Sequence, residues 1–344
     1  MIFDLRSDTV TKPCKAMLDA MVIAEVGDDV FNEDPSILKL EAKLAQLFGK
    51  EAALFVPSGT MANQISIKVH TQPMDEIILD KNAHIYYYET AGYAFHSGLS
   101  VKLVDGKNGI ITANDVLANI QAPLDWLPKT SLVCLENTHN KGGGACYELD
   151  NLKEIRKVCI ENNLKLHIDG ARIWNALVAK KYSPFDIGQQ CDSISVCFSK
   201  GLGAPVGSAI IGDFSFIKKA RRVRKAFGGG MRQVGILGAA CIYAIDNNLQ
   251  KLELDHQHAN EIANCLWEKD WVKSILPVET NMIIFEVDEQ KTSVLQILDL
   301  LKEKNILAVQ FGPKQIRLVF HLDIKPEMIP ILKSKMDEII ISNQ

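Results

Sequence analysis

Short apolar runs alternate with segments of helical periodicity from about residue 35 onward, and this alternation is the strongest constraint on the fold. The first helical segment has Asp34 as its cap, Pro35 in its first turn and Gly49 as its stop. Because strands that are apolar on both faces need cover on both sides, the pattern predicts an α/β fold with a mainly parallel sheet between two layers of helices. The apolar runs cover residues 52–56, 75–79, 100–104, 130–136, 164–169, 193–198 and 207–212.

The pattern changes after about residue 247. Residues 281–287 and 316–320 read as strands, with amphipathic helical segments around them. We therefore expect a large domain over residues 15–247 and a smaller C-terminal α+β domain over residues 248–344, which is within ordinary domain size.

Charge and hydropathy argue against several classes of partner. The chain has 38 Lys and Arg against 42 Asp and Glu, a formal net charge of −4, so it has no overall positive field for nucleic acid or anionic lipid. No apolar run approaches the roughly 20 residues that a membrane helix needs. The N-terminus lacks the apolar segment of a signal peptide. We expect neither a nucleic-acid nor a membrane partner.

The cysteine and histidine spacings predict no metal site. The eight cysteines stand singly and none has Cys-x-x-Cys spacing, and the eight histidines lack paired ligand spacing. Free cysteines in apolar surroundings pack as small hydrophobic side chains. We therefore expect buried, reduced thiols and a cytoplasmic location.

Three places where a predicted strand ends carry residues that suit a cofactor. Ser58, Gly59 and Thr60 lie at the N-terminus of a predicted helix, where free backbone N–H groups favour a phosphate. Asp169 ends one apolar strand, and Lys200 follows another among small and apolar residues. In an open parallel sheet, ligands collect at the carboxyl ends of the strands.

Each of these features has an ordinary structural explanation when it is taken alone. Strand-to-helix turns often contain Ser-Gly, Asp169 can pair with Arg172 or cap the next helix, and Lys200 can extend its ammonium group into solvent. Together they match what pyridoxal 5′-phosphate (PLP) requires: a phosphate cradle, a carboxylate for the pyridine nitrogen and a lysine for the aldehyde. The 31 positions from Asp169 to Lys200 allow one helix-containing crossover between their strands. The sequence therefore predicts a PLP site.

Eight segments, in this order along the chain, also resemble a known family. They are DLRSDTVTKP, EVGDDVFNEDP, GKEAALFVPSGTMAN, HIYYYE, LENTHN, LHIDGARIWNA, CFSKGLGAPVGS and GGGMRQ. On these motifs the chain resembles the low-specificity L-threonine aldolases of the β-eliminating lyase group over essentially its whole length. The resemblance implies a fold type I PLP-dependent transferase-like fold, with a mainly parallel seven-stranded sheet in the large domain and residues 1–14 packed near the active site.

The resemblance also implies roles for the cofactor-binding residues. Lys200 matches the lysine that bonds to PLP, Asp169 the partner of the pyridine nitrogen, and residues 58–60 the phosphate cradle. His84 matches the histidine that stacks on the cofactor ring, and our candidate for the catalytic base is His84 or a water molecule that it holds. Without the family, His84 reads as an ordinary loop histidine.

The substrate-binding residues follow from the same resemblance. Arg172 and Arg317, with Ser7 assisting, match the groups that bind the substrate carboxylate, and Arg172 also counts among the cofactor contacts. Trp126 stands where the family commonly has a histidine. Because an indole cannot accept a proton, we expect a changed preference between threo and erythro substrates, or a preference for a bulkier β-substituent.

A basic stretch over residues 220–233 has two interpretations. By itself it reads as a solvated helix face with a glycine stop at Gly228. In the family this stretch lies at a subunit interface, which implies a homodimer or homotetramer with shared active sites, in which Arg232 helps to bind a phosphate in the neighbouring site.

The resemblance implies PLP-dependent cleavage of L-threonine or L-allo-threonine to glycine and acetaldehyde. The alternatives are other type I PLP reactions on a β-hydroxy or β-substituted amino acid, such as phenylserine cleavage or β-elimination, and also transamination. The fold and Lys200 do not separate these reactions, because all of them share the cofactor chemistry. A non-catalytic binding protein that keeps the fold is the alternative of another class.

Overall fold

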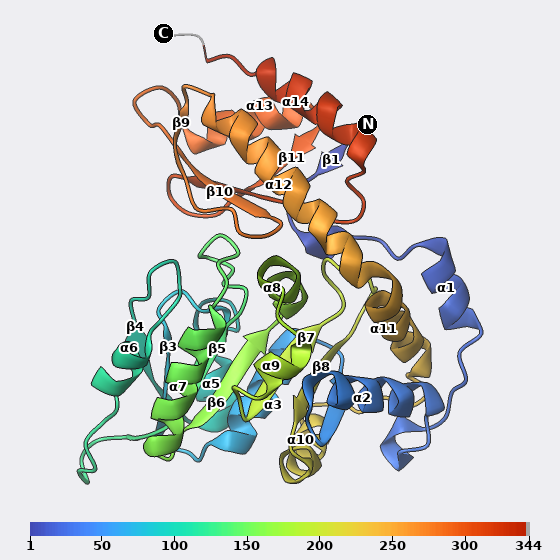
Figure 1. The fold of residues 1–344 in the computed structure, drawn as a ribbon, viewed down its shortest axis with the longest axis vertical. Coiled ribbons are helices and arrows are strands. Elements are labelled where there is room, and N and C mark those ends of the chain that lie inside the picture. The colour runs from blue at the N-terminus through green and yellow to red at the C-terminus, as the bar shows by residue number, and fades with distance from the viewer. Residues whose placement is uncertain (342–344) are drawn as a thin grey trace.

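The structure of the chain, a computed structural model, describes residues 1–341. A seven-stranded sheet forms its larger part, with the strand order β2-β8-β7-β6-β5-β3-β4 (Figure 1). All neighbouring pairs are parallel except the two that involve β8. The predicted mainly parallel seven-stranded sheet is confirmed. Its strands are β2 (Ala52–Val56), β3 (Asp75–Asp80), β4 (Ser100–Val104), β5 (Lys129–Glu136), β6 (Lys165–Gly170), β7 (Ser193–Cys197) and β8 (Ser208–Gly212).

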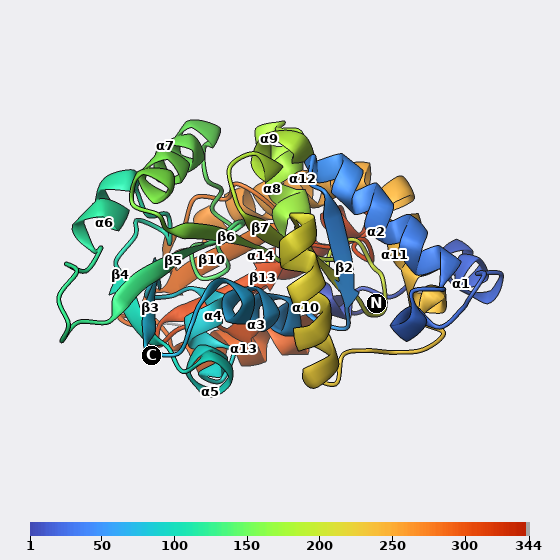
Figure 2. The same ribbon diagram turned by 90° about the horizontal axis from the view of Figure 1, so that it is seen from below.

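Helices cover both faces of this sheet, as Figure 2 shows from below. One face carries α3 (Gly59–His70), α4 (His84–Tyr87), α5 (Gly92–Ser97) and α10 (Phe214–Ala226). The other carries α2 (Pro35–Phe48), α6 (Ala113–Ala118), α7 (Leu149–Glu161), α8 (Ile173–Lys180) and α9 (Pro184–Gly188). Helix α11 (Gly235–Asn248) packs beside α1 (Lys15–Val22) and α2. The central strands are therefore buried on both sides, as their apolar sequences require.

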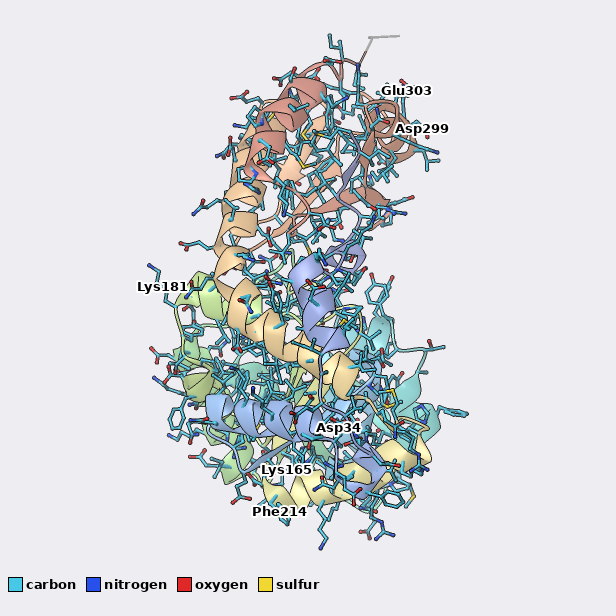
Figure 3. All side chains as sticks on the ribbon, turned by 90° about the vertical axis from the view of Figure 1, so that its right-hand side faces the viewer. Asp34, Lys165, Lys181, Phe214, Asp299 and Glu303 are labelled. Atoms are coloured by element: carbon cyan, nitrogen blue, oxygen red, sulfur yellow. The ribbon has the colours of Figure 1, made fainter. Side chains whose placement is uncertain are left out.

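Helix α2 shows how local sequence sets these boundaries. The Asp34 side chain, labelled in Figure 3, accepts the Ile37 N–H at 3.1 Å, and Gly49 ends the helix in the left-handed region at φ +59°. Asp34 also accepts the Gly235 N–H at 2.8 Å. A Cβ on Gly235 would lie 2.3 Å from the Asp34 carboxylate, so glycine is needed where α11 begins. The Asp34 side chain therefore caps the start of α2 and also binds the start of α11.

The C-terminal part has its own sheet and hydrophobic core. The sheet is antiparallel, in the order β12-β13-β10-β9, and α12 (Leu252–Trp267) runs from the large sheet to it (Figure 1). The strands β9 and β12 were not predicted, because both are short and partly exposed. The division at residues 247 and 248 stays a prediction. The other elements are β9 (Val272–Ile275), β10 (Met282–Val287), α13 (Val294–Glu303), β11 (Ile306–Leu307), β12 (Val309–Gln310), β13 (Gln315–Val319) and α14 (Ile329–Asp337).

The N-terminal segment starts on this C-terminal part. Strand β1 (Phe3–Asp4) pairs in parallel with β11, and the Phe3 and Leu5 side chains belong to the C-terminal core. The 3₁₀ turn η1 (Asp8–Val10) then carries the chain toward the large sheet. Over residues 1–341, no helix combines the length and the apolar character that crossing a membrane requires.

Asp255 on α12 provides a test of this packing. It is buried, and its Oδ2 has no hydrogen-bond partner within the described residues. Burial, with a further contribution from the charge of Asp8, raises the pKa of Asp255 to about 8. The folded state therefore binds more protons than the unfolded state between about pH 4 and pH 8, so this residue lowers the stability as the pH rises through that range.

We expect Asp255→Asn to remove this pH-dependent loss of stability. The variant should become more stable than the wild type as the pH rises from 5 to 8, with a gain of about 1 kcal/mol or more at pH 8. Urea unfolding at several pH values measures the difference. Asp19→Asn, on an exposed helix face, is the control. Parallel stability curves for the wild type and Asp255→Asn would contradict the assignment.

Candidate active site

Two adjoining cavities open at the carboxyl ends of the central strands. The first has a volume of about 250 Å³, and its lining includes Ser7, Tyr88, Asn140, Arg172 and Arg317. The second has a volume of about 170 Å³, and its lining includes Ser58, Gly59, Thr60, Asn63, Glu89 and Asp169. His84 and Lys200 line both. The structure thus brings together nine of the predicted site residues, and Trp126 and Arg232 are the two that it leaves outside.

The second cavity contains the N-terminus of α3. The Ser58 hydroxyl accepts the Met61 N–H at 3.2 Å and caps the helix. The first N–H groups of a helix have no partner inside the helix, so those of Gly59 and Thr60 suit an anion. A Cβ on Gly59 would lie 2.8 Å from the Cys197 sulfur, so only a glycine lets the helix start approach β7 this closely. This geometry fits a phosphate group.

Asp169 lies near the end of β6, is buried, and accepts hydrogen bonds from two neutral donors at the edge of the second cavity. Its Oδ1 accepts the Ala171 N–H at 3.0 Å, and its Oδ2 accepts an Asn63 side-chain N–H at 2.9 Å. The alternative explanation, an ion pair between Asp169 and Arg172, is wrong, because the Arg172 guanidinium binds Asp8 instead. A buried carboxylate of this kind fits a cationic group in the cavity, such as a protonated pyridine nitrogen.

The Asp8–Arg172 pair is buried and bidentate. Arg172 Nε donates to Asp8 Oδ2 at 2.8 Å, and Nη2 donates to Oδ1 at 2.6 Å. Burial alone would raise the pKa of Asp8, but the charge and hydrogen bonds of Arg172 hold it well below its usual range. Asp8 therefore uses two of the five N–H donors of Arg172, and Nη1 lies 3.5 Å from Asn140 Oδ1.

Arg317 on β13 has more capacity for a new partner. Its Nη1 donates to Asn140 Oδ1 at 2.9 Å and its Nη2 to the Arg6 carbonyl at 2.9 Å, but its Nε is buried and has no partner among residues 1–341. Burial, and then the positive charge of Arg172, lowers the pKa of Arg317 to about 10. A carboxylate in the first cavity would offset both effects.

His84 lies between the two cavities. Its Nδ1 is 3.1 Å from Glu89 Oε1, and its backbone N–H donates to Glu136 Oε2 at 2.7 Å. Burial alone would lower the pKa of His84, but the hydrogen bond to Glu89 and the charges of Asp169, Glu89 and Glu136 raise it above its ordinary value. The imidazole is thus set to carry a proton on Nδ1, toward Glu89.

His84, Glu89 and Asp169 also have potential metal-ligand atoms within 4.8 Å of one another. The carboxylate oxygens already accept N–H groups from Asn63, Gln64 and Ala171. This donor set therefore matches hydrogen bonding to carboxylates better than it matches a cation bound directly to them.

Lys200 lies in the turn after β7, at the junction of the cavities. Its carbonyl accepts the Gly203 N–H at 2.8 Å, which fixes the turn, and its side chain is partly exposed. Lys200 therefore lies between the cavity that contains the N-terminus of α3 and the cavity that contains Arg172 and Arg317.

Trp126 and Arg232 lie away from both cavities of this chain. Trp126 is 77% exposed in the loop between α6 and β5. Arg232 Nη1 donates to Asp28 at 2.8 Å, and its guanidinium lies 5.8 Å from the ring centroid of Phe31. A contact of Trp126 with substrate, and of Arg232 with a phosphate, stay predictions, and both would need a second copy of the chain or a moved loop.

Several site residues were not assigned a role from the sequence. Asn63 lies one helical turn after Gly59, which is a spacing that places both on the same face of α3. Glu89, Asn140 and Asp8 belong to the motifs HIYYYE, LENTHN and DLRSDTVTKP. The sequence shows a polar residue inside each of these motifs, which could have marked it as a site residue. Only the structure shows which side chain it binds.

Comparison with known proteins agrees with this geometry. The model of a family described as β-eliminating lyase matches residues 4–290. The chain belongs to the β-eliminating lyase family. It is 43% identical over 327 residues to "Low-specificity L-threonine aldolase 1" of Arabidopsis thaliana, covering 93% of this chain and 91% of that protein. It is 42% identical over 329 residues to "Low specificity L-threonine aldolase" of Escherichia coli K12, covering 95% and 96%. The predicted resemblance is confirmed.

Solved structures show the same fold for this member of the β-eliminating lyase family. The Leishmania major threonine aldolase structure superposes with a TM-score of 0.86 at 20% identity, covering 97% of this chain and 98% of that one. A Sphingomonas wittichii serine palmitoyltransferase superposes with a TM-score of 0.75 at 15% identity, covering 98% and 86%. The predicted fold class is confirmed.

The buried Asp8–Arg172 pair gives a stability prediction. Asp8→Asn leaves the Arg172 charge buried without its partner, so we expect the free energy of unfolding to fall by about 3 kcal/mol at pH 7. Chemical denaturation measures this change. Asp4→Asn is the control, because its pair with Arg6 is half exposed and should matter little. Equal stabilities of Asp8→Asn and the wild type would contradict the importance of the pair.

Proposed function

We propose that this chain cleaves L-threonine and L-allo-threonine to glycine and acetaldehyde, with PLP as its cofactor. The observation that supports it most is the pair of cavities joined at Lys200 and His84, one with an anion cradle and Asp169, the other with two arginines. The relatives at 43% and 42% identity carry the name low-specificity L-threonine aldolase.

In this proposal the second cavity holds PLP. The N–H groups at the start of α3 bind its phosphate, Asp169 pairs with its pyridine nitrogen, and Lys200 is its covalent attachment point. When bound, PLP supplies an electron sink for the bond that breaks at the substrate Cα. His84 lines this cavity and is placed to cover the ring.

The first cavity holds the amino acid. Arg317 binds its carboxylate through guanidinium N–H groups that face the cavity, while Asn140 and the Arg6 carbonyl keep the guanidinium in place. Arg172 adds positive charge, and Ser7 adds a hydroxyl at the rim. Holding the carboxylate fixes the direction of the Cα–Cβ bond, and orientation of this kind lowers the barrier by several kcal/mol.

Cleavage moves protons at two atoms. The β-hydroxyl loses its proton as the Cα–Cβ bond breaks, so that acetaldehyde forms, and Cα then gains a proton to give glycine. His84 is our candidate for the base at the hydroxyl, because it lies where the two cavities meet. Glu89 holds Nδ1, so the other ring nitrogen is the one that exchanges the proton.

The assembly and location also belong to this proposal. We infer a homodimer or homotetramer with shared active sites, since Arg232 lies outside the cavities of its own chain yet matches a phosphate-binding residue of the family. We infer a cytoplasmic location from the eight cysteines, which are all unpaired and mostly buried.

Product analysis tests the reaction. We expect acetaldehyde and glycine in equal amounts from L-threonine and L-allo-threonine, and no turnover by Lys200→Ala. Borohydride reduction of the PLP-loaded wild type should fix the cofactor on Lys200. Pyruvate with ammonia would indicate β-elimination instead, and a Lys200→Ala variant that keeps substantial turnover would refute the role of the lysine.

Substrate kinetics test Arg317. We expect Arg317→Leu to raise the KM for L-threonine by roughly tenfold to hundredfold, because a charged hydrogen bond contributes roughly 1.5–3 kcal/mol. Arg317→Lys keeps the positive charge but loses the planar guanidinium group. We therefore expect its KM for L-threonine to lie between that of the wild type and that of Arg317→Leu. An unchanged KM in Arg317→Leu would indicate that the substrate carboxylate binds to other residues.

A further inference from the structure

Asn63 is a buried amide whose four hydrogen-bonding positions are all used. It donates one N–H to Glu89 Oε1 at 2.8 Å and the other to Asp169 Oδ2 at 2.9 Å. Its Oδ1 accepts from Ser195 Oγ at 2.8 Å and from His167 Nε2 at 3.2 Å. The side chain is 1% exposed, so water does not replace any of these partners.

This set of partners permits one orientation of the amide. A flipped side chain would place its oxygen against two carboxylates and its N–H groups against the Ser195 hydroxyl and the His167 ring. Burial lowers the pKa of His167 to about 4, so the ring is neutral and one of its nitrogens donates. Ser193 Oγ, at 2.9 Å from Nδ1, can donate to that nitrogen and leave Nε2–H for Asn63.

The two carboxylates would compete for a proton without this amide between them. Asp169 and Glu89 have oxygens within 4.8 Å of each other, and two carboxylates this close in a buried site favour sharing a proton. Burial, with a further contribution from the charge of Asp169, raises the pKa of Glu89. His84 and Gln64 bind the remaining face of Glu89.

We propose that Asn63 is a positioning residue that keeps the acidic proton off Asp169, by donating one N–H to Asp169 and one to Glu89, so that Asp169 meets the cofactor ring as an anion. The inference rests on the proposed PLP site and adds to it a residue that controls the protonation of Asp169. Other titratable groups that face this cluster from the surrounding elements are Glu136, His84, His167 and Lys200. His139 and the buried thiols of Cys134 and Cys197 face it as well.

Two ligands that form no covalent bond to Lys200 can distinguish an effect on the charge of Asp169 from a general loss of cofactor binding. The first is 4′-deoxypyridoxine 5′-phosphate, which has the ring nitrogen but no aldehyde. The second is its 1-deaza analogue, which has carbon in place of the ring nitrogen and so gains nothing from an anionic Asp169. Equilibrium titration of the apoenzyme between pH 6.5 and pH 9 gives the dissociation constants.

We expect Asn63→Leu to weaken binding of the first ligand at least tenfold at pH 6.5, relative to the wild type. The loss should shrink toward pH 9, because the shared proton leaves the two carboxylates. Binding of the 1-deaza analogue should change less than threefold at every pH. Asn63→Ala removes the same two donors, leaves room for water and should give the same pH dependence if Asn63→Leu does not fold.

Gln64→Leu is the matched control. Gln64 donates to Glu89 Oε2 at 2.6 Å from the next position of α3. Within the described residues the Asp169 carboxylate accepts from Asn63 and Ala171 and not from Gln64, so we expect a change below threefold without a pH trend. An equal loss at all pH values, an equal loss for both ligands, or the same effect from Gln64→Leu would overturn the proposal. A wild-type apoenzyme that binds neither ligand would instead refute the PLP site itself.

Discussion

The arrangement of the active site depends on a charge pair that is removed from water. Asp8 comes from the N-terminal segment, whose first strand belongs to the C-terminal core, and Arg172 follows the end of β6 in the large sheet. An unpaired charge at either position would be costly to bury, so the pair favours one placement of the segment over the sheet. Ser7 reaches the first cavity because its neighbour is held in this way. Arg317 joins the same group through Asn140, so residues from both sheets surround one volume.

The sequence was sufficient for the elements whose character is local. Strands β5 and β7 are buried on both faces and carry few charged residues, so they leave a continuous signal in the sequence. The cap and stop of α2 were predicted because Asp34, Pro35 and Gly49 act within one or two turns. The direction of β8 depends on how its connection from β7 is packed, and a short strand such as β9 has too few residues to show a period.

In the candidate site, too, the residues with a local sequence signal were predicted and those that depend on packing were not. Asp169 and Lys200 were predicted because a carboxylate and a lysine at strand ends in apolar surroundings are conspicuous in one dimension. The partner of Asp169 was not, because Asn63 is 106 positions away and contacts it only after α3 packs on the sheet. Trp126 lies in a loop between α6 and β5, and the position of such a loop is not encoded in a local pattern. Motifs therefore indicate which residues matter, and packing decides which of them act on each other.

Glu136 shows how this packing fixes the distance between the two cavities. It ends β5 beside Asp169 in the sheet register, and its two oxygens accept different backbone N–H groups, from His84 at 2.7 Å and from Asn140 at 2.9 Å. His84 covers the cavity with the anion cradle, and Asn140 holds Arg317 in the other. Each oxygen of the Glu136 carboxylate accepts one of these N–H groups. Neither His84 nor Asn140 can therefore shift away from Glu136 without losing a buried hydrogen bond. The spacing between His84 and the Asn140–Arg317 pair therefore depends on one buried side chain, Glu136.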